Sequence, residues 1–195
     1  MNKRNVLVYV LGWRAWIADA LYLMSDAKTK QLIQEDLERY MKKETSYQKV
    51  GLVSLNYCLL FGETFRNVFY YRIQGHGLLK TLSKAFVKPL QTIEIGGEIA
   101  GGLRINHKNA VVYPYSVGKN FTVGPNVVIG KGPCHDNGDI NSPIIGDNVS
   151  ILPNAVVTGG IKIGNNVTVG AGTIVVKSIP DNCVVIGNPA KILER

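Results

Sequence analysis

Residues 144–176 read IIGDNVSILPNAVVTGGIKIGNNVTVGAGTIVV, and in this stretch an aliphatic residue returns at every sixth position. The same spacing begins at residue 93 and is interrupted once, after residue 129. Its positions are Ile93, Ile99, Ile105, Val111, Val117, Val123 and Ile129, then Ile145, Ile151, Val157, Ile163, Val169 and Val175. A period of six fits neither an α-helix nor an isolated strand. The sequence therefore predicts a solenoid of stacked triangular coils, each side one hexapeptide long.

A glycine follows many of these aliphatic residues, at Gly118, Gly124, Gly130, Gly146, Gly164 and Gly170. Glycine adopts backbone conformations that a Cβ atom makes costly, and asparagine tolerates them next best. Asparagines stand close by, at Asn120, Asn126, Asn148, Asn165 and Asn166. We expect these residues to form the corners of the coils. A second small or branched residue, four positions after the repeat, is expected to fill the interior, as at Val127, Val149, Ala155 and Val167.

The repeats and the phrases around them resemble the hexapeptide-repeat acyltransferases, in particular their serine acetyltransferase branch, which includes polysaccharide O-acetyltransferases. The resemblance covers residues 60–195 and includes FRNVFYYRI at 65–73. It is strongest over 144–192, in the phrases IIGDNV, GGIKIGNNVTVGAGTIVVKSIPDN and VVIGNPAKIL. It implies a mainly β fold, a left-handed parallel β-helix preceded by an α-helical region. The handedness comes from the family alone.

Before the repeats, residues 26–85 carry apolar side chains at helical spacing, with Asp26 in position to cap the first helix. Gly75-His76-Gly77 breaks this pattern, and Lys88-Pro89 leads into the first coil. We therefore expect an α-helical region over residues 1–87 and the β-helix over 88–195. The aromatic run at 65–73 is expected to be buried.

The first twenty residues have some features of a signal peptide, namely Lys3-Arg4, an apolar run from Val6 to Leu11, and the small-x-small triplet Ala18-Asp19-Ala20. Trp13 and Arg14 interrupt the apolar run before it reaches the roughly twenty residues that span a bilayer. We expect an amphipathic or irregular segment instead. Its aromatic side chains are candidates for peripheral contact with a membrane surface or a partner.

The composition suits a solenoid with a helical cap, at 195 residues, 21.3 kDa and 46% hydrophobic residues. Cys58, Cys134 and Cys183 are odd in number and lack a C-x-x-C pair, which argues against a disulfide framework and for a reducing, cytoplasmic location. The net charge of +8 comes from scattered lysines and arginines without a nucleic-acid-binding motif. It suits a phosphate-rich ligand such as coenzyme A, or an anionic surface.

Gly102-Leu103-Arg104-Ile105-Asn106-His107 matches a G-[LI]-x-I-D-H phrase that holds the reactive histidine of the serine acetyltransferase branch. The resemblance implies that His107 is the general base. An imidazole near its reference pKa can accept the proton of an acceptor hydroxyl while the oxygen attacks a thioester. Asn106 replaces the family's aspartate, and an asparagine can orient the imidazole but brings no charge. The alternative is an ordinary surface histidine.

The interruption from Ile129 to Ile145 spans 16 positions, which is not a multiple of six, so a loop over about 131–143 leaves the coil. Its Cys134, His135, Asp136 and Asp139 lack the spaced ligand pairs of a zinc site, and we expect no metal. His135 and Asp136 are instead candidates for binding the acceptor. The resemblance adds Ser142, which stands where the family has a second histidine before its P-x-IG-D phrase.

The resemblance further implies acetyl-CoA as co-substrate, lying in a groove between subunits of a homotrimer whose active sites are shared. The matching small residues are Gly130, Gly132, Ala155, Gly160 and Ala171, and the candidates for the nucleotide phosphates are Lys177 and Lys191. Small residues also suit tight turns, and exposed lysines are common without a ligand. The short helical region leaves pairing of trimers into a hexamer open.

Together these features predict an acetyl-CoA-dependent O-acetyltransferase. A sugar hydroxyl in surface-polysaccharide biosynthesis is the favoured acceptor, because Asn106, Ser142 and the short helical region depart from the serine enzymes. The alternative acceptor is L-serine, which would give O-acetyl-L-serine for cysteine biosynthesis. A non-catalytic trimeric scaffold is the alternative from another class.

Overall fold

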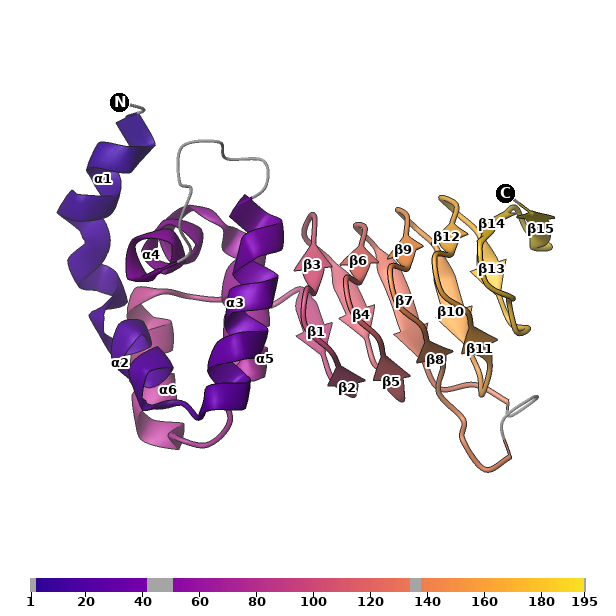
Figure 1. The fold of residues 1–195 in the computed structure, drawn as a ribbon, viewed down its shortest axis with the longest axis horizontal. Helices are drawn as coiled ribbons and strands as arrows, with labels where there is room; N and C mark the ends of the chain where they lie inside the picture. Colours follow the sequence, from indigo (N-terminus) through magenta and orange to yellow (C-terminus); the bar gives the residue numbers. More distant parts are fainter. Residues whose placement is uncertain (1–2, 42–50, 134–137, 195) are drawn as a thin grey trace. The chain divides into compact units, whose positions relative to one another are not determined.

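The computed structural model describes residues 3–41, 51–133 and 138–194, and it divides into a helical unit that ends at Leu90 and a β-solenoid that begins at Gln91 (Figure 1). The sequence placed this boundary near residue 87. The described helices of the first unit are α1 (Lys3–Leu11), the 3₁₀ helix η1 (Gly12–Ala15), α2 (Trp16–Met24), α3 (Ala27–Met41), α4 (Leu52–Phe61), α5 (Glu63–Arg72) and α6 (Gly77–Phe86).

The helical unit has its own apolar core, in which the aromatic run of α5 is central. Phe65, Phe69 and Tyr70 are buried there, as the sequence predicted. Asp26 caps α3, because its Oδ1 accepts a hydrogen bond of 2.7 Å from the Thr29 N–H. That hydrogen bond lowers the pKa of the Asp26 carboxyl. The break at Gly75–Gly77 is also confirmed, with His76 in the left-handed region at φ 52°.

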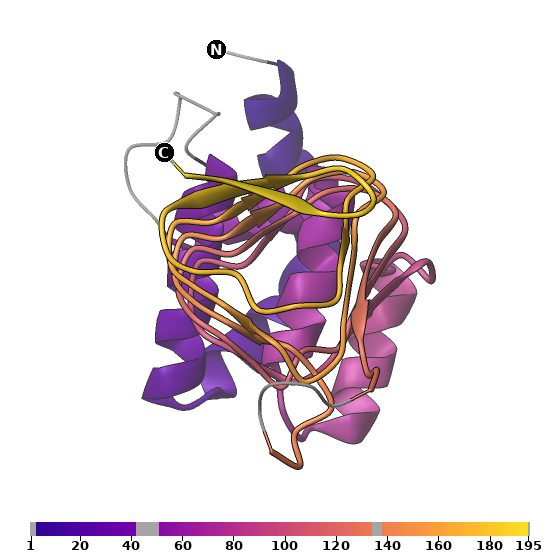
Figure 2. The same ribbon diagram turned by 90° about the vertical axis from the view of Figure 1, so that its right-hand side faces the viewer.

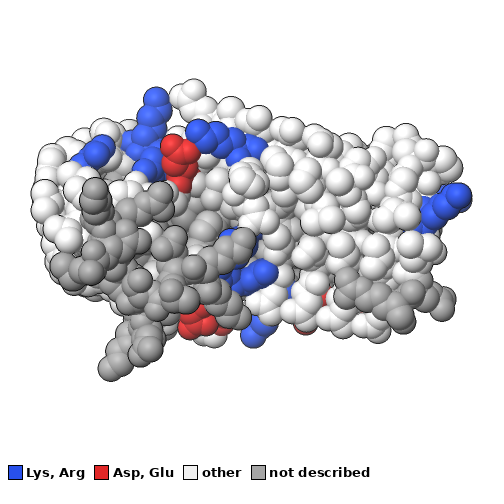
Figure 3. Space-filling view, turned by 90° about the horizontal axis from the view of Figure 1, so that it is seen from above, with Lys and Arg blue, Asp and Glu red and all other residues white. Residues whose placement is uncertain are grey.

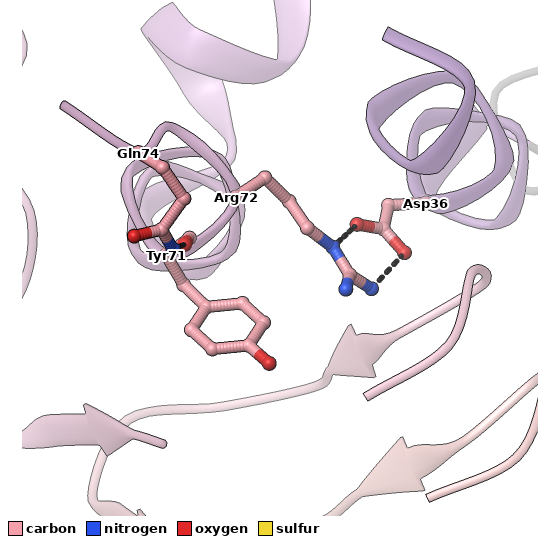
Figure 4. Close-up of polar contacts among 4 residues, drawn as sticks. All are labelled: Asp36, Tyr71, Arg72 and Gln74. Carbon is pink, nitrogen blue, oxygen red and sulfur yellow. Dashed lines mark hydrogen bonds and ion pairs between the residues drawn. The ribbon is translucent and has the colours of Figure 1, made fainter. Parts of the chain in front are cut away.

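A buried ion pair joins α3 to α5 (Figure 4). Arg72 donates from Nε to Asp36 Oδ2 at 2.8 Å and from Nη2 to Asp36 Oδ1 at 3.1 Å. The two side chains are 3% and 0% exposed. The guanidinium also lies 5.2 Å from the centre of the Tyr71 ring. This two-pronged geometry is the strong form of an arginine–carboxylate contact.

The second unit is a parallel β-helix whose coils are triangular in cross-section (Figure 2). Its three sides are referred to as sheets A, B and C. Sheet A contains β1 (Ile93–Ile95), β4 (Ala110–Val112), β7 (Val127–Gly130), β10 (Val156–Thr158) and β13 (Ile174–Val175). Sheet B contains β2 (Glu98–Ile99), β5 (Ser116–Val117), β8 (Ile144–Ile145) and β11 (Lys162–Ile163). Sheet C contains β3 (Arg104–Ile105), β6 (Thr122–Val123), β9 (Ser150–Ile151), β12 (Thr168–Val169), β14 (Cys183–Ile186) and β15 (Lys191–Glu194).

The interior of the solenoid consists of stacked aliphatic columns, as the six-residue repeat predicted. In sheet C, Ile105, Val123, Ile151, Val169 and Val185 lie in register and are fully buried. The second interior residues, Val127, Val149, Ala155 and Val167, are fully buried as well. Burial of one such Val or Ile side chain contributes on the order of 1.5–3 kcal/mol. At the C-terminal end β15 pairs antiparallel with β14 and covers the last coil.

One residue of the predicted repeat, Val111, does not point inward. It pairs with Val128, which is 42% exposed, whereas its neighbour Val112 pairs with Ile129 and is fully buried. Consecutive residues of a strand face opposite sides, so a register one residue later places Val112 in the core. The prediction of Val111 as an interior residue was therefore wrong.

The predicted reason for the corner glycines is also corrected. The left-handed positions at the corners belong mostly to asparagines, among them Asn120, Asn148 and Asn166, with φ between 56° and 60°. Their amide groups form a ladder from coil to coil, in which Asn120 bonds to Asn148 at 3.0 Å and Asn148 to Asn166 at 3.1 Å. Gly146 is needed for space instead, because a Cβ there would lie 2.6 Å from Asn165 Oδ1 of the next coil.

Candidate active site

His107 lies on the turn between β3 and β4, at the edge where sheet C meets sheet A. The buried Ile105 ends one strand and the buried Ala110 begins the next, so the residues between them project from the coil. Asn109 makes the bend at φ 64°. The Asn106 N–H donates to the Val123 carbonyl at 2.9 Å, which fixes the start of the turn. Both predicted catalytic residues, His107 and Asn106, are exposed.

This turn is one residue longer than its equivalents in the later coils. Ile105 is in register with Val123 and Ala110 with Val127, so four residues (106–109) correspond to three (124–126) in the next coil. The turns 152–154 and 170–172 also have three residues. The extra residue lengthens the turn on which the exposed His107 lies.

The predicted loop leaves the solenoid at another edge, where sheet A meets sheet B. Its base is closed by the Gly132 N–H, which donates to the Asn141 carbonyl at 2.9 Å, and by Thr158 Oγ1, which donates to the Lys131 carbonyl at 2.7 Å. Ser142, one of the predicted acceptor residues, is 8% exposed at the end of the loop. The other two, His135 and Asp136, lie outside the described residues, as does Cys134.

The predicted donor residues fall into two groups. Gly130, Gly132, Gly160 and Lys177 lie at the edge between sheets A and B, near the base of the loop, whereas Ala171 is in the same turn position as His107, three coils later. Lys191 is exposed in the terminal hairpin. A Cβ on Gly130 would meet no atom within 4 Å, so neighbouring coils leave space beside this residue. The site residues of one protomer are thus spread over two edges.

Ala155 and Gly160 need correction as ligand-facing residues. Ala155 is fully buried, in the interior column with the fully buried Val127 and Thr173, so its methyl group faces the core. Gly160 is buried beside the buried Ile161. Their small size is explained by packing within the coils, and neither offers exposed surface to a coenzyme.

The outward face of sheet A is apolar, a feature that the sequence reading missed. Val128, Ile174 and Val176 are 42%, 36% and 43% exposed on it. The equivalent outward positions of sheet C are Thr122, Ser150 and Thr168, and Glu98 and Lys162 lie outward on sheet B. In the view of Figure 3 most of the solenoid surface carries no charged side chain. The available signal was the residue just before the repeat position, which is apolar at Val128, Val156 and Ile174 of sheet A and polar at most, though not all, such positions of the other two sheets.

The loop was expected to hold no metal, and its main candidate ligands lie outside the described residues. Among the residues that the structure describes, no three His, Cys, Asp or Glu side chains are grouped as metal ligands. His107 carries an exposed imidazole, a group that can act as a general base.

The fold and its repeat define the class of protein. The family "Bacterial transferase hexapeptide (six repeats)" matches residues 142–177. The chain can also be superposed on solved serine acetyltransferases. With the Neisseria gonorrhoeae enzyme in complex with serine, the TM-score is 0.67 at 24% identity, over 99% of this chain and 84% of that one. With a serine acetyltransferase in complex with CoA, the TM-score is 0.66 at 18% identity, over 99% and 86% of the two chains. These likenesses confirm the predicted fold, a left-handed parallel β-helix with an N-terminal helical region.

Similarity to two curated proteins identifies the family of the chain. The serine acetyltransferase of Staphylococcus epidermidis is 30% identical over 173 residues, which are 85% of this chain and 76% of that protein. The chain belongs to the serine acetyltransferase family of hexapeptide-repeat transferases. The serine acetyltransferase of Staphylococcus aureus strain Mu50 is 37% identical over 108 residues, 53% of this chain and 48% of that protein. The chain thus spans about half the length of several curated relatives that it matches.

Proposed function

We propose that this protein is a serine O-acetyltransferase that transfers the acetyl group of acetyl-CoA to the hydroxyl of L-serine. The observation that carries the proposal is the position of His107. It lies in the family's catalytic phrase, on a lengthened and exposed turn, within a chain that belongs to the serine acetyltransferase family.

In the proposed reaction His107 takes the proton of the serine hydroxyl while the oxygen attacks the thioester carbonyl. The tetrahedral intermediate then collapses, the carbon–sulfur bond breaks, and the imidazolium returns the proton to the departing CoA thiolate. The products are O-acetyl-L-serine and CoA, and no redox step occurs. General base catalysis of this kind contributes typically 10²–10⁴-fold to the rate, and holding both substrates in place contributes much of the rest.

Acetyl-CoA is proposed to lie against sheet A and the edge beside the loop. The space beside Gly130 admits a ligand close to the backbone, and Val128 and Ile174 supply apolar surface for the pantetheine arm. Lys177 lies exposed at the same edge, where it suits a phosphate group. The solved serine acetyltransferase with CoA bound has the same fold, which supports the same donor here.

We propose that the active site is completed by a second copy of the chain in a homotrimer. In one protomer, His107 and the loop lie on opposite sides of sheet A, and a six-residue side spans at most about 20 Å. Packing of the apolar face of sheet A against a neighbouring copy would bring the loop edge of one protomer toward the His107 edge of the next. Sedimentation at three times the chain mass of 21.3 kDa is the expected result.

The serine acceptor replaces the sugar acceptor that the sequence favoured. That preference rested on Asn106, on Ser142 and on the short helical region. The relatives and solved structures named above are serine acetyltransferases, and they support the alternative that the sequence left open. A cytoplasmic location is also proposed, because the three cysteines suit a reducing compartment and the reaction needs acetyl-CoA.

The test is CoA release from acetyl-CoA by the purified chain, with L-serine in one reaction and amino sugars, hexoses and nucleotide sugars in others. Serine-dependent turnover is expected, and His107→Ala should lower kcat by 10²–10⁴-fold. His76→Asn serves as a matched control, because it replaces another histidine, in the helical unit, with a residue that tolerates the left-handed backbone. Turnover with sugars alone would refute the serine assignment, and inactivity with every acceptor would favour the scaffold.

A second variant tests the role of Asn106. An aspartate at this position would hold the imidazole and stabilise the imidazolium, as in serine hydrolases, where loss of the corresponding charge lowers kcat by about 10⁴-fold. Asn106→Asp is therefore expected to raise kcat with little change in the KM for acetyl-CoA. An unchanged kcat would show that residue 106 does not act on the base.

A further inference from the structure

Helix α6 exposes its apolar stripe, whereas its one buried residue, Ser83, is polar. Leu78, Leu82 and Phe86, one turn apart, are 77%, 46% and 37% exposed. On the other side Ser83 is 1% exposed and its hydroxyl is 2.8 Å from the Tyr70 hydroxyl, while Lys80 Nζ donates to the Ile73 carbonyl at 2.6 Å. An amphipathic helix of a globular protein normally turns its apolar stripe to the core. This helix does the opposite.

The apolar stripe of α6 continues onto the N-terminal helices. The Trp13 ring, 62% exposed, lies 6.4 Å from the Phe86 ring in an edge-to-face arrangement. Arg14 Nη2 donates to the Phe86 carbonyl at 3.2 Å and holds the two segments together. We call the surface formed by Trp13, Leu78, Leu79, Leu82 and Phe86 the outer patch.

The segments that form the outer patch carry exposed basic side chains. Arg14, Lys84 and Lys88 are exposed on the segments that form it, and the sequence from Gly77 to Lys88 contains no acidic residue. The first 90 residues hold 14 Lys and Arg against 7 Asp and Glu, a net charge of +7 out of +8 for the chain. A twofold contact between two such patches would bring like charges together. An anionic surface would complement them.

We propose that the outer patch binds the surface of an anionic lipid bilayer. Trp, Phe and Leu side chains in the headgroup region, with Lys and Arg around them, are the composition of helices that lie in the membrane interface. Each basic side chain near an anionic leaflet strengthens the attraction, and salt weakens it. All residues of the outer patch belong to the helical unit, so the inference does not depend on the acetyltransferase assignment.

The N-terminal helices are expected to lie on the bilayer rather than cross it. By length and composition alone Val6–Met24 qualifies as a span, with 19 residues at a mean hydropathy of 1.4. Yet Val8, Ala15, Ala18 and Leu21 are part of the core of the helical unit, together with residues of α3, α4 and α5. A transmembrane orientation would remove these side chains from the core.

The test is co-sedimentation of the full chain with vesicles of phosphatidylcholine containing 30% phosphatidylglycerol, and with vesicles of phosphatidylcholine alone. Binding to the anionic vesicles is expected, with release in high salt. Lys84→Glu/Lys88→Glu should weaken binding at least tenfold, and Leu78→Ser/Leu82→Ser should abolish it. Lys162→Glu, a single charge reversal of the same kind on an exposed residue of the solenoid, should bind like the wild type. Unchanged thermal unfolding and CoA release would show that the patch variants are folded.

Four outcomes would overturn the proposal. Absence of binding to both kinds of vesicle, or equal loss of binding in Lys162→Glu, would remove the outer patch as a lipid site. A fall in sedimenting mass of Leu78→Ser/Leu82→Ser without vesicles would show that a second copy covers the patch. Binding that resists high salt and alkaline extraction would show that Val6–Met24 inserts across the bilayer instead.

Discussion

Replacing Arg72 with methionine should severely destabilise the helical unit. Methionine keeps much of the apolar stem of arginine but removes the guanidinium that donates to both carboxylate oxygens of Asp36, at 2.8 Å and 3.1 Å. Because the Asp36 side chain is 0% exposed, water cannot replace the lost cation. Removal of one partner from a buried ion pair costs about 3–5 kcal/mol. A domain of ordinary stability has about 5–15 kcal/mol, so the variant should fold but with a narrow margin.

Urea unfolding followed by circular dichroism at 222 nm measures this loss, because the helical signal comes from the first 90 residues. With a slope of about 1–3 kcal/mol per molar urea, the midpoint should fall by at least about 1 M. Lys28→Met, which removes an exposed cation from the same helix as Asp36, should change it little.

The double variant Asp36→Leu/Arg72→Met decides whether the reasoning is right. With both charges gone no ion is left buried, and apolar replacement of such a pair is often neutral or stabilising. The double variant should therefore be more stable than Arg72→Met alone, with a coupling energy of roughly 2 kcal/mol or more. A single variant that loses under about 1 kcal/mol, or a double variant that loses the sum of both singles, would refute the account.

Three further predictions concern the solenoid and the N-terminal helices. Gly118→Ala should lower the melting temperature, because its Cβ would collide with Asp147 Oδ1. Gly130→Ala should leave stability unchanged, because a Cβ there meets no atom within 4 Å, and should raise the KM for acetyl-CoA. Equal melting temperatures for the two variants would contradict this. Deletion of Lys108 should restore a three-residue turn, preserve the β-helix spectrum and abolish CoA release; retained turnover would show that the longer turn is not needed. Asp19→Asn should stabilise the protein by roughly 1 kcal/mol at pH 7, since burial raises the pKa of Asp19 and its Oδ1 has no hydrogen-bond partner. Because the folded-state pKa of Asp19 is raised, the ionised carboxylate destabilises the folded state above that pKa, and this cost disappears as the pH falls and the carboxyl is protonated. The melting temperatures of the wild type and of Asp19→Asn should therefore converge in acid. A constant difference down to pH 3 would disprove the assignment.

Much of the fold could be predicted because it depends on spacing along the chain. The repeat specified three sides per coil, and Ile105, Val123 and Ile151 took the predicted interior positions. The role of Gly146 could not be predicted in the same way. Its space is limited by Asn165, which approaches only when the next coil has stacked, and nothing in the local sequence shows this contact.

The site was predictable to a smaller extent. The sequence phrase around His107 identified the candidate base, and the 16-residue spacing between Ile129 and Ile145, which is not a multiple of six, identified the loop. The inward orientation of Ala155 was misjudged, because a small residue near a turn can face either the core or a ligand. The exposed stripe of α6 escaped prediction for a related reason. Its pattern of Leu78, Leu82 and Phe86 is that of a core-facing helix, and only the packing of Ser83 against Tyr70 reveals the reversal.

The misplaced Val111 and the longer His107 turn have one cause. The interior residues Ile105 and Val112 are seven positions apart, and Val112 and Val117 are five apart, which together equal two hexapeptides. Counting every sixth residue from Ile105 therefore reaches Val117 correctly, although it selects Val111 instead of Val112 on the way. The surplus residue is added to the turn that carries His107, while the coils on both sides keep their pairing. Between residues 93 and 175 the six-residue period is broken twice, at this turn and at the loop after Ile129, and these are the two places where the candidate catalytic and acceptor residues lie. A solenoid tolerates such local changes because each coil is held by its neighbours, so catalytic groups can be added at an edge without disturbing the core.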